Sequence, residues 1–446
     1  MSTQRTKKLF SYVIPTVLAS CSSFLYTIVD GIFVGQGVGK EGLGAVNLAM
    51  PYVMIITALG MLMTIGGITM TAIYLGEKDE KAANKVFRHS LTASAVIGAV
   101  LMIAGMLFAT QIAQICGANG TFLEMTAEYI FYYSMFSLPF LMSVCMQGFV
   151  RNDGAPGLVS VAVVIASVIN IVLDWLLVFP LQMGIKGAAI ATGLGQLVSF
   201  LILLFHFIRK KGVLRFGKFR PDFKVWGEAI ARGLPEMITH FGTPITTLCM
   251  NRMLLQTLGD AAVPAFSVMS YIMSFAIGIF LGVSEGVQPL FGQSYGAKET
   301  DNLKYYFRAG LRLNFIASIV IYMLSSFFGR YICALFNPDT VLADIAAEAL
   351  PKFAWCFLFI ALNLMISSYL YSTKRTAQAI TIAVFRCIAL NSASILLLST
   401  LFGGSIVWFT PGIAEAVSLV IAVVLLKYAE RNGIVYKLDN EKERVL

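Results

Sequence analysis

Charged residues are scarce in this sequence of 446 residues, at 13% against 58% hydrophobic residues. Soluble domains usually carry about 25% charged residues, so this composition excludes an ordinary water-soluble fold. Apolar stretches long enough to cross a bilayer recur from Leu9 to Lys427. The sequence therefore predicts an all-α membrane protein with about twelve transmembrane helices.

Residues for disulfides, metal sites and hydrolytic catalysis are also sparse. The seven cysteines include no CxxC pair and lie mostly in apolar stretches, where cysteine packs as a small hydrophobic residue. The three histidines, His89, His206 and His240, are scattered, and no HExxH motif occurs. We therefore expect neither an enzymatic activity nor a cofactor.

The net charge of +9 is explained by where the basic residues lie. With the N-terminus inside, the inner segments hold most of the 33 Lys and Arg residues, with Arg386 assigned to the inner loop after Lys374 and Arg375. The five exceptions are Lys40, Lys186, Arg252, Arg330 and Lys352. This asymmetry predicts a multi-pass protein of the cell membrane with both termini in the cytoplasm, and it requires no nucleic acid. The basic stretch from Arg209 to Arg232 could also touch anionic lipid.

The sequence matches itself at a constant offset, the repeat offset, which places Pro15 on Pro235 and Gly39 on Gly259. We expect two pseudo-symmetric six-helix lobes, residues 1–208 and 227–446, joined by a basic cytoplasmic linker, residues 209–226. Parallel repeats of this kind are typical of secondary transporters, in which the repeat interface forms a cavity near the midplane. We expect the protein to function as a monomer.

Ionisable side chains at membrane depth cost about 2.5–3.5 kcal/mol each, so each needs an explanation. Asp30, Asp174 and Thr192 are predicted at one depth in the first half, and Asn170 shares a helical face with Asp174. Two carboxylates in a poorly hydrated pocket can share one proton, because ionising both is unfavourable. Alternatively, these oxygens could bind a hard cation such as Na⁺. A purely structural role, with Asp30 capping a turn before Gly31, is the remaining interpretation.

A second polar cluster is predicted from the other half of the sequence. Glu236 and His240 share a helical face, and Glu285 is expected at a similar depth on the next helix. These three side chains could contact substrate, or they could be polar groups with a role in helix packing only. Glu415 is interpreted as an isolated acid.

Proline recurs in the predicted spans, and each proline removes a helical hydrogen bond. Pro15 lies on the same span as Asp30, so bending at Pro15 could be coupled to protonation of that carboxyl. Most other prolines need no functional explanation, because neighbouring helices tolerate them.

Several motifs are similar to those of the multidrug and toxic compound extrusion (MATE) family. They are Val29–Gly35, Asn170–Asp174, Gly187–Thr192, Gln288–Leu290 and Tyr295–Lys298. In this order on an internal repeat, they make the sequence resemble that family over essentially its whole length. The resemblance implies two six-helix lobes in a V, and export of amphipathic, usually cationic, drugs or metabolites in exchange for H⁺ or Na⁺.

The resemblance also implies a cation-coupling site in the N-terminal lobe. Its residues would be Asp30, Tyr129, Asn170, Asp174 and Thr192. Pro15 matches a proline that bends the first helix in some proposals for the family.

One departure separates the sequence from the NorM-like branch of the family. That branch carries acidic residues after the seventh-span proline and in the tenth span. Here the first of these positions is Pro244, and residues 353–372 contain no acid. Coupling through the N-terminal lobe is therefore preferred, and Glu236 and Glu285 could instead contact cationic substrate.

The main alternative function is a flippase for a lipid-linked precursor. Such a protein would need several basic residues in its cavity to hold a pyrophosphate. No Lys or Arg lies deep in the predicted first-half spans, which argues against this function. An Arg252 side chain accessible in the cavity would argue for it.

Overall fold

The structure is a computed structural model that describes residues 2–259, 262–336 and 340–431. Every regular element in these ranges is helical. The first half contains α1 (Ser2–Gly37), α2 (Lys40–Gly76), α3 (Glu80–Leu107), α4 (Ala109–Ile115), α5 (Thr121–Ser134), α6 (Ser137–Asn152), α7 (Pro156–Val178) and α8 (Gly184–Ile208). The second contains α9 (Phe223–Thr257), α10 (Ala262–Gly296), α11 (Thr300–Phe336), α12 (Thr340–Ala354), α13 (Phe357–Ser372), α14 (Thr376–Val384), the π-helix η1 (Phe385–Leu390), α15 (Asn391–Phe402), the 3-10 helix η2 (Gly404–Phe409) and α16 (Thr410–Arg431).

Ten helical segments in the described residues are long and apolar enough to cross a membrane. The pair α5 and α6, bent by 51° at its break, forms an eleventh if it is one span. Helix α9 is less apolar, but its 35 residues would extend about 52 Å at 1.5 Å per residue. The predicted all-α membrane fold of about twelve transmembrane helices is confirmed.

The chain forms two compact units. Unit 1 comprises Met1–Phe241 with Gly292–Lys298, and unit 2 comprises Gly242–Phe291 with Glu299–Leu446. Helices α9 and α10 therefore each contribute one part to unit 1 and the other to unit 2. The lobe boundaries predicted from the sequence, at residues 208 and 227, stay predictions.

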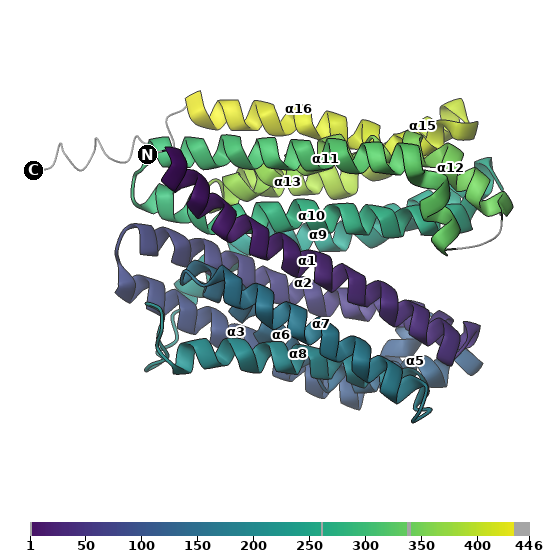
Figure 1. Ribbon diagram of the computed structural model, residues 1–446, viewed down its shortest axis with the longest axis horizontal. Coiled ribbons are helices and arrows are strands. Elements are labelled where there is room, and N and C mark those ends of the chain that lie inside the picture. Colours follow the sequence, from purple (N-terminus) through teal and green to yellow (C-terminus); the bar gives the residue numbers. More distant parts are fainter. Residues whose placement is uncertain (1, 260–261, 337–339, 432–446) are drawn as a thin grey trace, which may run out of the picture. The chain divides into compact units, whose positions relative to one another are not determined.

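Within unit 1, helices α1, α2, α3, α6, α7 and α8 run side by side (Figure 1). Helix α7 packs between α1 and α8, and α6 packs against α3 and α8. A hydrophobic core that includes Tyr129 and Tyr133 is formed by residues of α1, α2, α4, α5, α6, α7 and α8. This packing places the polar faces of α1, α7 and α8 toward one another.

The backbone of the two halves repeats with the offset found in the sequence. Left-handed backbone angles (φ > 0) recur at four pairs of positions separated by the repeat offset, where helices are joined by tight turns. The pairs are Gly39 and Gly259, Lys78 and Lys298, Gly154 and Lys374, and Gly184 and Gly404. Because such angles are uncommon, their recurrence fixes the register in which the two halves can be compared.

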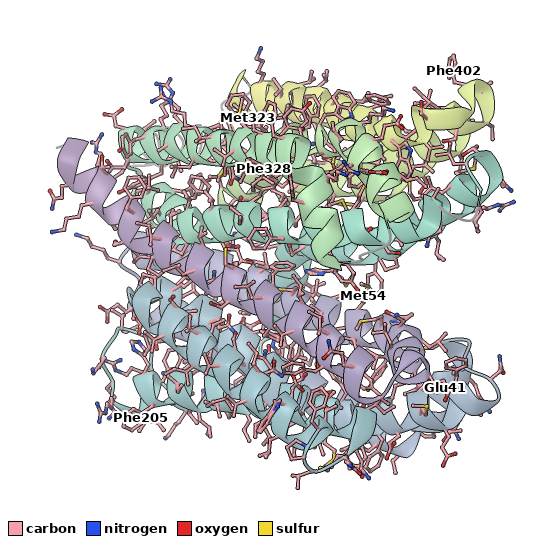
Figure 2. The ribbon with its side chains drawn as sticks, turned by 45° about the vertical axis from the view of Figure 1, so that its right-hand side comes forward. Glu41, Met54, Phe205, Met323, Phe328 and Phe402 are labelled. Atoms are coloured by element: carbon pink, nitrogen blue, oxygen red, sulfur yellow. The ribbon has the colours of Figure 1, made fainter. Side chains whose placement is uncertain are left out.

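Large apolar side chains on the outer faces are exposed rather than packed. Phe205, Met323, Phe328 and Phe402, labelled in Figure 2, are 49%, 52%, 53% and 72% exposed. Exposed apolar surface on this scale is unfavourable in water but is the normal lipid-facing surface of a membrane helix.

A buried carboxylate holds the first part of the linker that follows α8. Asp153 Oδ2 lies 3.0 Å from His206 Nε2, and the His206 and Asp153 side chains are 4% and 0% exposed. Asp153 Oδ1 accepts hydrogen bonds from the backbone N–H groups of Val213 (2.6 Å) and Leu214 (3.1 Å). The linker therefore turns back onto unit 1 instead of extending away from it.

Helix α3 holds the rest of the linker. The Asn84 side chain bonds both the N–H of Arg215 (2.5 Å) and the carbonyl of Val213 (3.2 Å). His89 Nε2 accepts from the N–H of Asp222 at 3.0 Å. The Asp222 carboxylate also pairs with Lys85 Nζ at 2.6 Å, and this hydrogen bond holds the pKa of Asp222 below its ordinary value.

Asp153→Ala is expected to release the linker from unit 1. The substitution leaves two backbone N–H groups and the buried His206 ring without an acceptor, and each unsatisfied buried group costs about 1–3 kcal/mol. Trypsin should then cleave after the linker Lys and Arg residues at least about tenfold faster, since 1.4 kcal/mol corresponds to a factor of ten. Glu124→Ala, which removes an exposed carboxylate on α5, is the control. Equal cleavage rates in the two variants would contradict this account of the linker.

Candidate functional site

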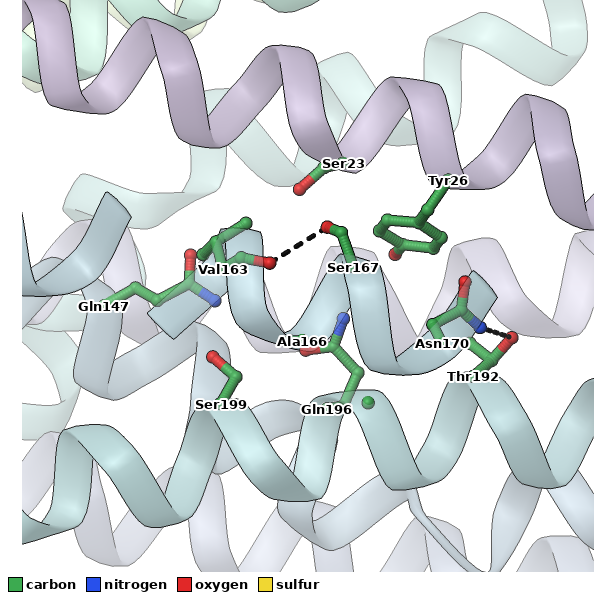
Figure 3. Close-up of a pocket in the computed structure, with 11 residues that line it drawn as sticks. Ser23, Tyr26, Gln147, Val163, Ala166, Ser167, Asn170, Thr192, Gln196 and Ser199 are labelled. Atoms are coloured by element: carbon green, nitrogen blue, oxygen red, sulfur yellow. Dashed lines mark hydrogen bonds between the residues drawn. The ribbon is translucent and has the colours of Figure 1, made fainter. Parts of the chain in front are cut away.

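A polar pocket with an empty volume of about 300 Å³ lies between α1, α6, α7 and α8 of unit 1 (Figure 3). Most of its lining is polar, including Tyr26 from α1, Asn170 from α7, and Thr192 and Gln196 from α8. Gly195 makes the close approach of α7 and α8 possible, because a Cβ there would lie 3.0 Å from the carbonyl oxygen of Ala166.

Four of the predicted site residues lie at or beside this pocket. Asn170 Nδ2 donates to Thr192 Oγ1 at 3.4 Å, and both residues line the pocket (Figure 3). Asp174 follows Asn170 by one helical turn and is 0% exposed. The carboxyl groups of Asp30 and Asp174 lie within interaction range of each other. The structure thus brings Asp30, Asn170, Asp174 and Thr192 into one region, while their role in coupling stays a prediction.

Several buried oxygen atoms at this site lack a hydrogen-bond partner among the described residues. Asp30 Oδ1, Asn170 Oδ1 and both carboxylate oxygens of Asp174 are buried and form no hydrogen bond of ordinary geometry within the described residues. Within residues 2–259, 262–336 and 340–431, no basic side chain forms an ion pair with Asp30 or Asp174. Burying two such carboxyl groups is costly unless a cation or a proton compensates the charge. Carboxylate, amide and hydroxyl oxygens fit a hard cation such as Na⁺, and the paired carboxyls equally fit a shared proton.

Two tyrosines lie close enough to both carboxyl groups to interact with them electrostatically. Tyr129, predicted from the resemblance, is 4% exposed and stacks on Tyr133 with ring centroids 5.9 Å apart. Tyr26 is not among the residues predicted from the sequence, although it precedes Asp30 by four residues on the same helical face. This four-residue spacing is the sequence feature that could have placed Tyr26 beside Asp30. The hydroxyl of Tyr26 also reaches Gln196 across the pocket.

The other predicted functional residues lie elsewhere. Pro15 lies inside α1, which is helical from Ser2 to Gly37, and its part in bending stays a prediction. Glu236 and His240 belong to unit 1, whereas Glu285 belongs to unit 2. The second polar cluster therefore remains a prediction.

The interpretation of Glu415 as an isolated acid is wrong. Its carboxylate accepts from Arg386 Nε at 2.9 and 3.0 Å, and Asn363 Nδ2 donates to it at 2.7 Å. The assignment of Arg386 to an inner loop is also wrong, because it lies inside the span Thr376–Phe402. The side chains of Arg386 and Glu415 are only 8% and 6% exposed.

A repeated all-helical membrane fold is typical of a membrane transporter when its described residues place buried carboxyl oxygens, without a basic partner, beside a polar pocket. The MatE family profile matches the chain twice, over residues 15–176 and 235–397. The starts of the two matches, residues 15 and 235, are the positions of Pro15 and Pro235 and so differ by the repeat offset. The chain belongs to the MatE family, so the resemblance to MATE transporters is confirmed. Because members of this family are transporters, the chain is not expected to act as an enzyme, as the sequence indicated.

Known relatives extend along nearly the whole chain. It is 26% identical to the multidrug export protein MepA of Staphylococcus haemolyticus over 433 residues, covering 96% of this chain and 94% of the relative. It is 25% identical to MepA of Staphylococcus aureus strain NCTC 8325, covering 94% and 93%.

Solved structures share the fold. A MATE crystal structure in complex with MaL6 superimposes with a TM-score of 0.91 at 22% identity, covering 97% of both chains. A MOP superfamily transporter from Pyrococcus furiosus gives 0.90 at 23% identity and the same coverage. A mutant of the Vibrio cholerae MATE transporter VcmN gives 0.90 at 19% identity, covering 97% of this chain and 99% of that one.

Proposed function

We propose that the protein is a multidrug efflux antiporter, which exports amphipathic organic cations in exchange for a proton or Na⁺ bound in unit 1. The observation that carries the proposal is the group of buried oxygens on Asp30, Asn170 and Asp174, in which the two carboxyl groups have no basic partner among the described residues. The relatives named as multidrug export proteins support the choice of substrate class.

Charge explains how one site can couple the two fluxes. With both carboxyl groups ionised, the region carries two buried negative charges, so a cation or a proton is strongly favoured there. Binding a proton or Na⁺ lowers that charge and weakens the attraction for an organic cation. Competition of this kind gives exchange without requiring both ligands to bind at once.

The flippase alternative receives no support from the pocket. Its lining, as far as the described residues form it, contains Ser, Tyr, Gln, Asn and Thr side chains but no Lys or Arg to hold a pyrophosphate. The distribution of the basic residues is best explained by membrane topology, with the protein in the cell membrane and both termini in the cytoplasm. We propose that it acts there as a monomer.

The test is substrate transport by the purified protein in proteoliposomes. A fluorescent organic cation such as ethidium is supplied on one side, and a proton gradient or a Na⁺ gradient is imposed separately. We expect one of the two ion gradients to drive ethidium against its own concentration gradient. Loss of this transport when the matching ionophore dissipates the ion gradient identifies the coupling ion. Transport that follows only the ethidium gradient under both conditions would overturn the proposal of antiport.

A further inference from the structure

A fully paired acid and base lie in the interior of unit 2. Arg386 on η1 and Glu415 on α16 form an ion pair through Arg386 Nε, and Asn363 on α13 bonds both the carboxylate and the backbone carbonyl of Glu415. Asn391 donates to the carbonyl of Arg386 at 2.8 Å. Ionisable residues in a membrane span are rare and usually functional, yet the proposed transport site does not use this pair.

The internal repeat shows which positions of unit 1 correspond to this pair. At the repeat offset, Arg386 corresponds to Ala166 and Glu415 corresponds to Gly195. The left-handed residues Gly154 and Lys374, and Gly184 and Gly404, fix this register at the starts of the helices concerned. Ala166 and Gly195 both line the polar pocket of unit 1.

The same two positions therefore carry small uncharged residues in one half and an ion pair in the other. In unit 1 they carry the smallest side chains, on α7 and α8, and polar groups surround a pocket. In unit 2 they carry a guanidinium and a carboxylate in contact.

The acids of the unit 1 site have no counterpart in the repeat. Asp30, Asn170 and Asp174 correspond to Met250, Leu390 and Ser394. None of these three positions in the second half carries a carboxyl group. Glu415 is therefore a carboxylate at a different position of the repeat, and its partner Arg386 is supplied by the chain itself.

The backbone of unit 2 is adapted to the pair. Residues 385–390 form a π-helix, whereas the corresponding residues of α7 are α-helical throughout. A π-helical turn is wider than an α-helical turn and is often found at functional sites. Arg386 lies in this widened turn, where its side chain is 8% exposed.

We propose that Arg386 is a built-in cation, which occupies in unit 2 the position equivalent to the unit 1 pocket and so prevents Glu415 from binding an exchangeable proton or Na⁺. Glu415 is a cation-binding carboxylate whose cation is covalently part of the chain. The protein then exchanges ions in one half only. Removal of the guanidinium exposes a second site of the same chemical class.

The test is modification by dicyclohexylcarbodiimide, followed by peptide mass spectrometry on the detergent-purified protein. This reagent adds to a protonated carboxyl in an apolar environment, and the adduct rearranges to a stable N-acylurea without a leaving group. An ion-paired carboxylate lacks that proton. We expect Glu415 to remain unmodified in wild type and to be modified at least about tenfold more in Arg386→Gln, a difference of about 1.4 kcal/mol or more. Protection of that variant by NaCl would show that the exposed carboxylate also takes Na⁺.

Arg386→Lys and Arg386→Gln/Glu415→Gln are the matched controls. Lysine keeps a cation in place and should restore protection, and the double variant sets the background. Equal modification of Glu415 in folded wild type and Arg386→Gln, whether high or absent, would overturn the proposal. Labelling of Asp30 and Asp174 is scored separately, so failure of the proposed unit 1 site is distinguishable from failure of this one.

A second variant covers the case in which Arg386→Gln does not fold. Arg386→Met/Glu415→Leu replaces the pair with apolar side chains, which proteins often tolerate without loss of stability. If unit 2 exchanges no ion, this variant retains transport with the wild-type dependence on the ion gradient. A folded variant that has lost that dependence would overturn the proposal.

Discussion

Asp174→Asn is expected to reduce gradient-driven efflux of ethidium from cells to the level of cells without the transporter, a loss of at least about tenfold. The side chain is fully buried beside Asp30 and Asn170, and the amide keeps its size while removing its charge and its proton-binding site. Without that carboxylate, the region can no longer alternate between an ionised and a neutralised state. Efflux is measured at matched expression, with membrane insertion checked by fluorescence-detected size exclusion.

Glu128→Gln is the matched control for this prediction. It removes a carboxylate one residue before Tyr129, but this one is 41% exposed and lies 3.9 Å from Lys186. An exposed pair of this kind contributes little, so efflux should remain close to wild type. Asp30→Asn should reproduce the loss seen with Asp174→Asn. Full efflux by a well-expressed Asp174→Asn protein would contradict the assignment of coupling to unit 1.

Gly66→Ala is expected to destabilise unit 1 strongly. A Cβ at Gly66 on α2 would overlap the backbone carbonyl of Ala229 on α9, and a Cβ at Gly233 would overlap that of Leu62 in the reverse direction. Backbone atoms cannot rotate away as a side chain can, so the two helices must separate. Overpacking of this kind costs about 1–3 kcal/mol and occasionally more.

The measurement is thermal aggregation of the purified protein, with Gly157→Ala as the control. Gly157 lies in the first turn of α7, is exposed, and has no atom within 4 Å of an added Cβ. Alanine there should be neutral or slightly stabilising, because it favours the helix. A Gly66→Ala protein as stable as Gly157→Ala would show that α2 and α9 do not pack through these glycines.

Much of the fold and part of the site could be predicted because the signals are local or repetitive. Apolar stretches of membrane length define the helices, and the constant offset between matching residues reveals the two halves. Asn170 and Asp174 lie four residues apart on one helix, so their shared face followed from helical geometry. Tyr26 and Asp30 have the same spacing, but an uncharged tyrosine in an apolar span gives no signal of its own.

The pair in unit 2 could not be predicted, because its members lie on different helices and 29 residues apart. Basic residues close to the start of a span are naturally assigned to the adjoining inner loop, and Arg386 was misplaced for that reason. The linker presented a similar difficulty. Its basic composition was plain, but its path depends on backbone hydrogen bonds to Asp153, Asn84 and His89, which no composition reveals.

The most direct test of the account is reciprocal flux in proteoliposomes without an imposed ion gradient. Ethidium is added to one side only, while pyranine reports protons and ²²Na⁺ reports sodium on the other. We expect ethidium entry to drive one of these ions out through the wild-type protein, and we expect Asp174→Asn to abolish this ion flux. Ethidium entry that moves neither ion, or an ion flux that persists in Asp174→Asn, would contradict antiport through the carboxyl pair of unit 1.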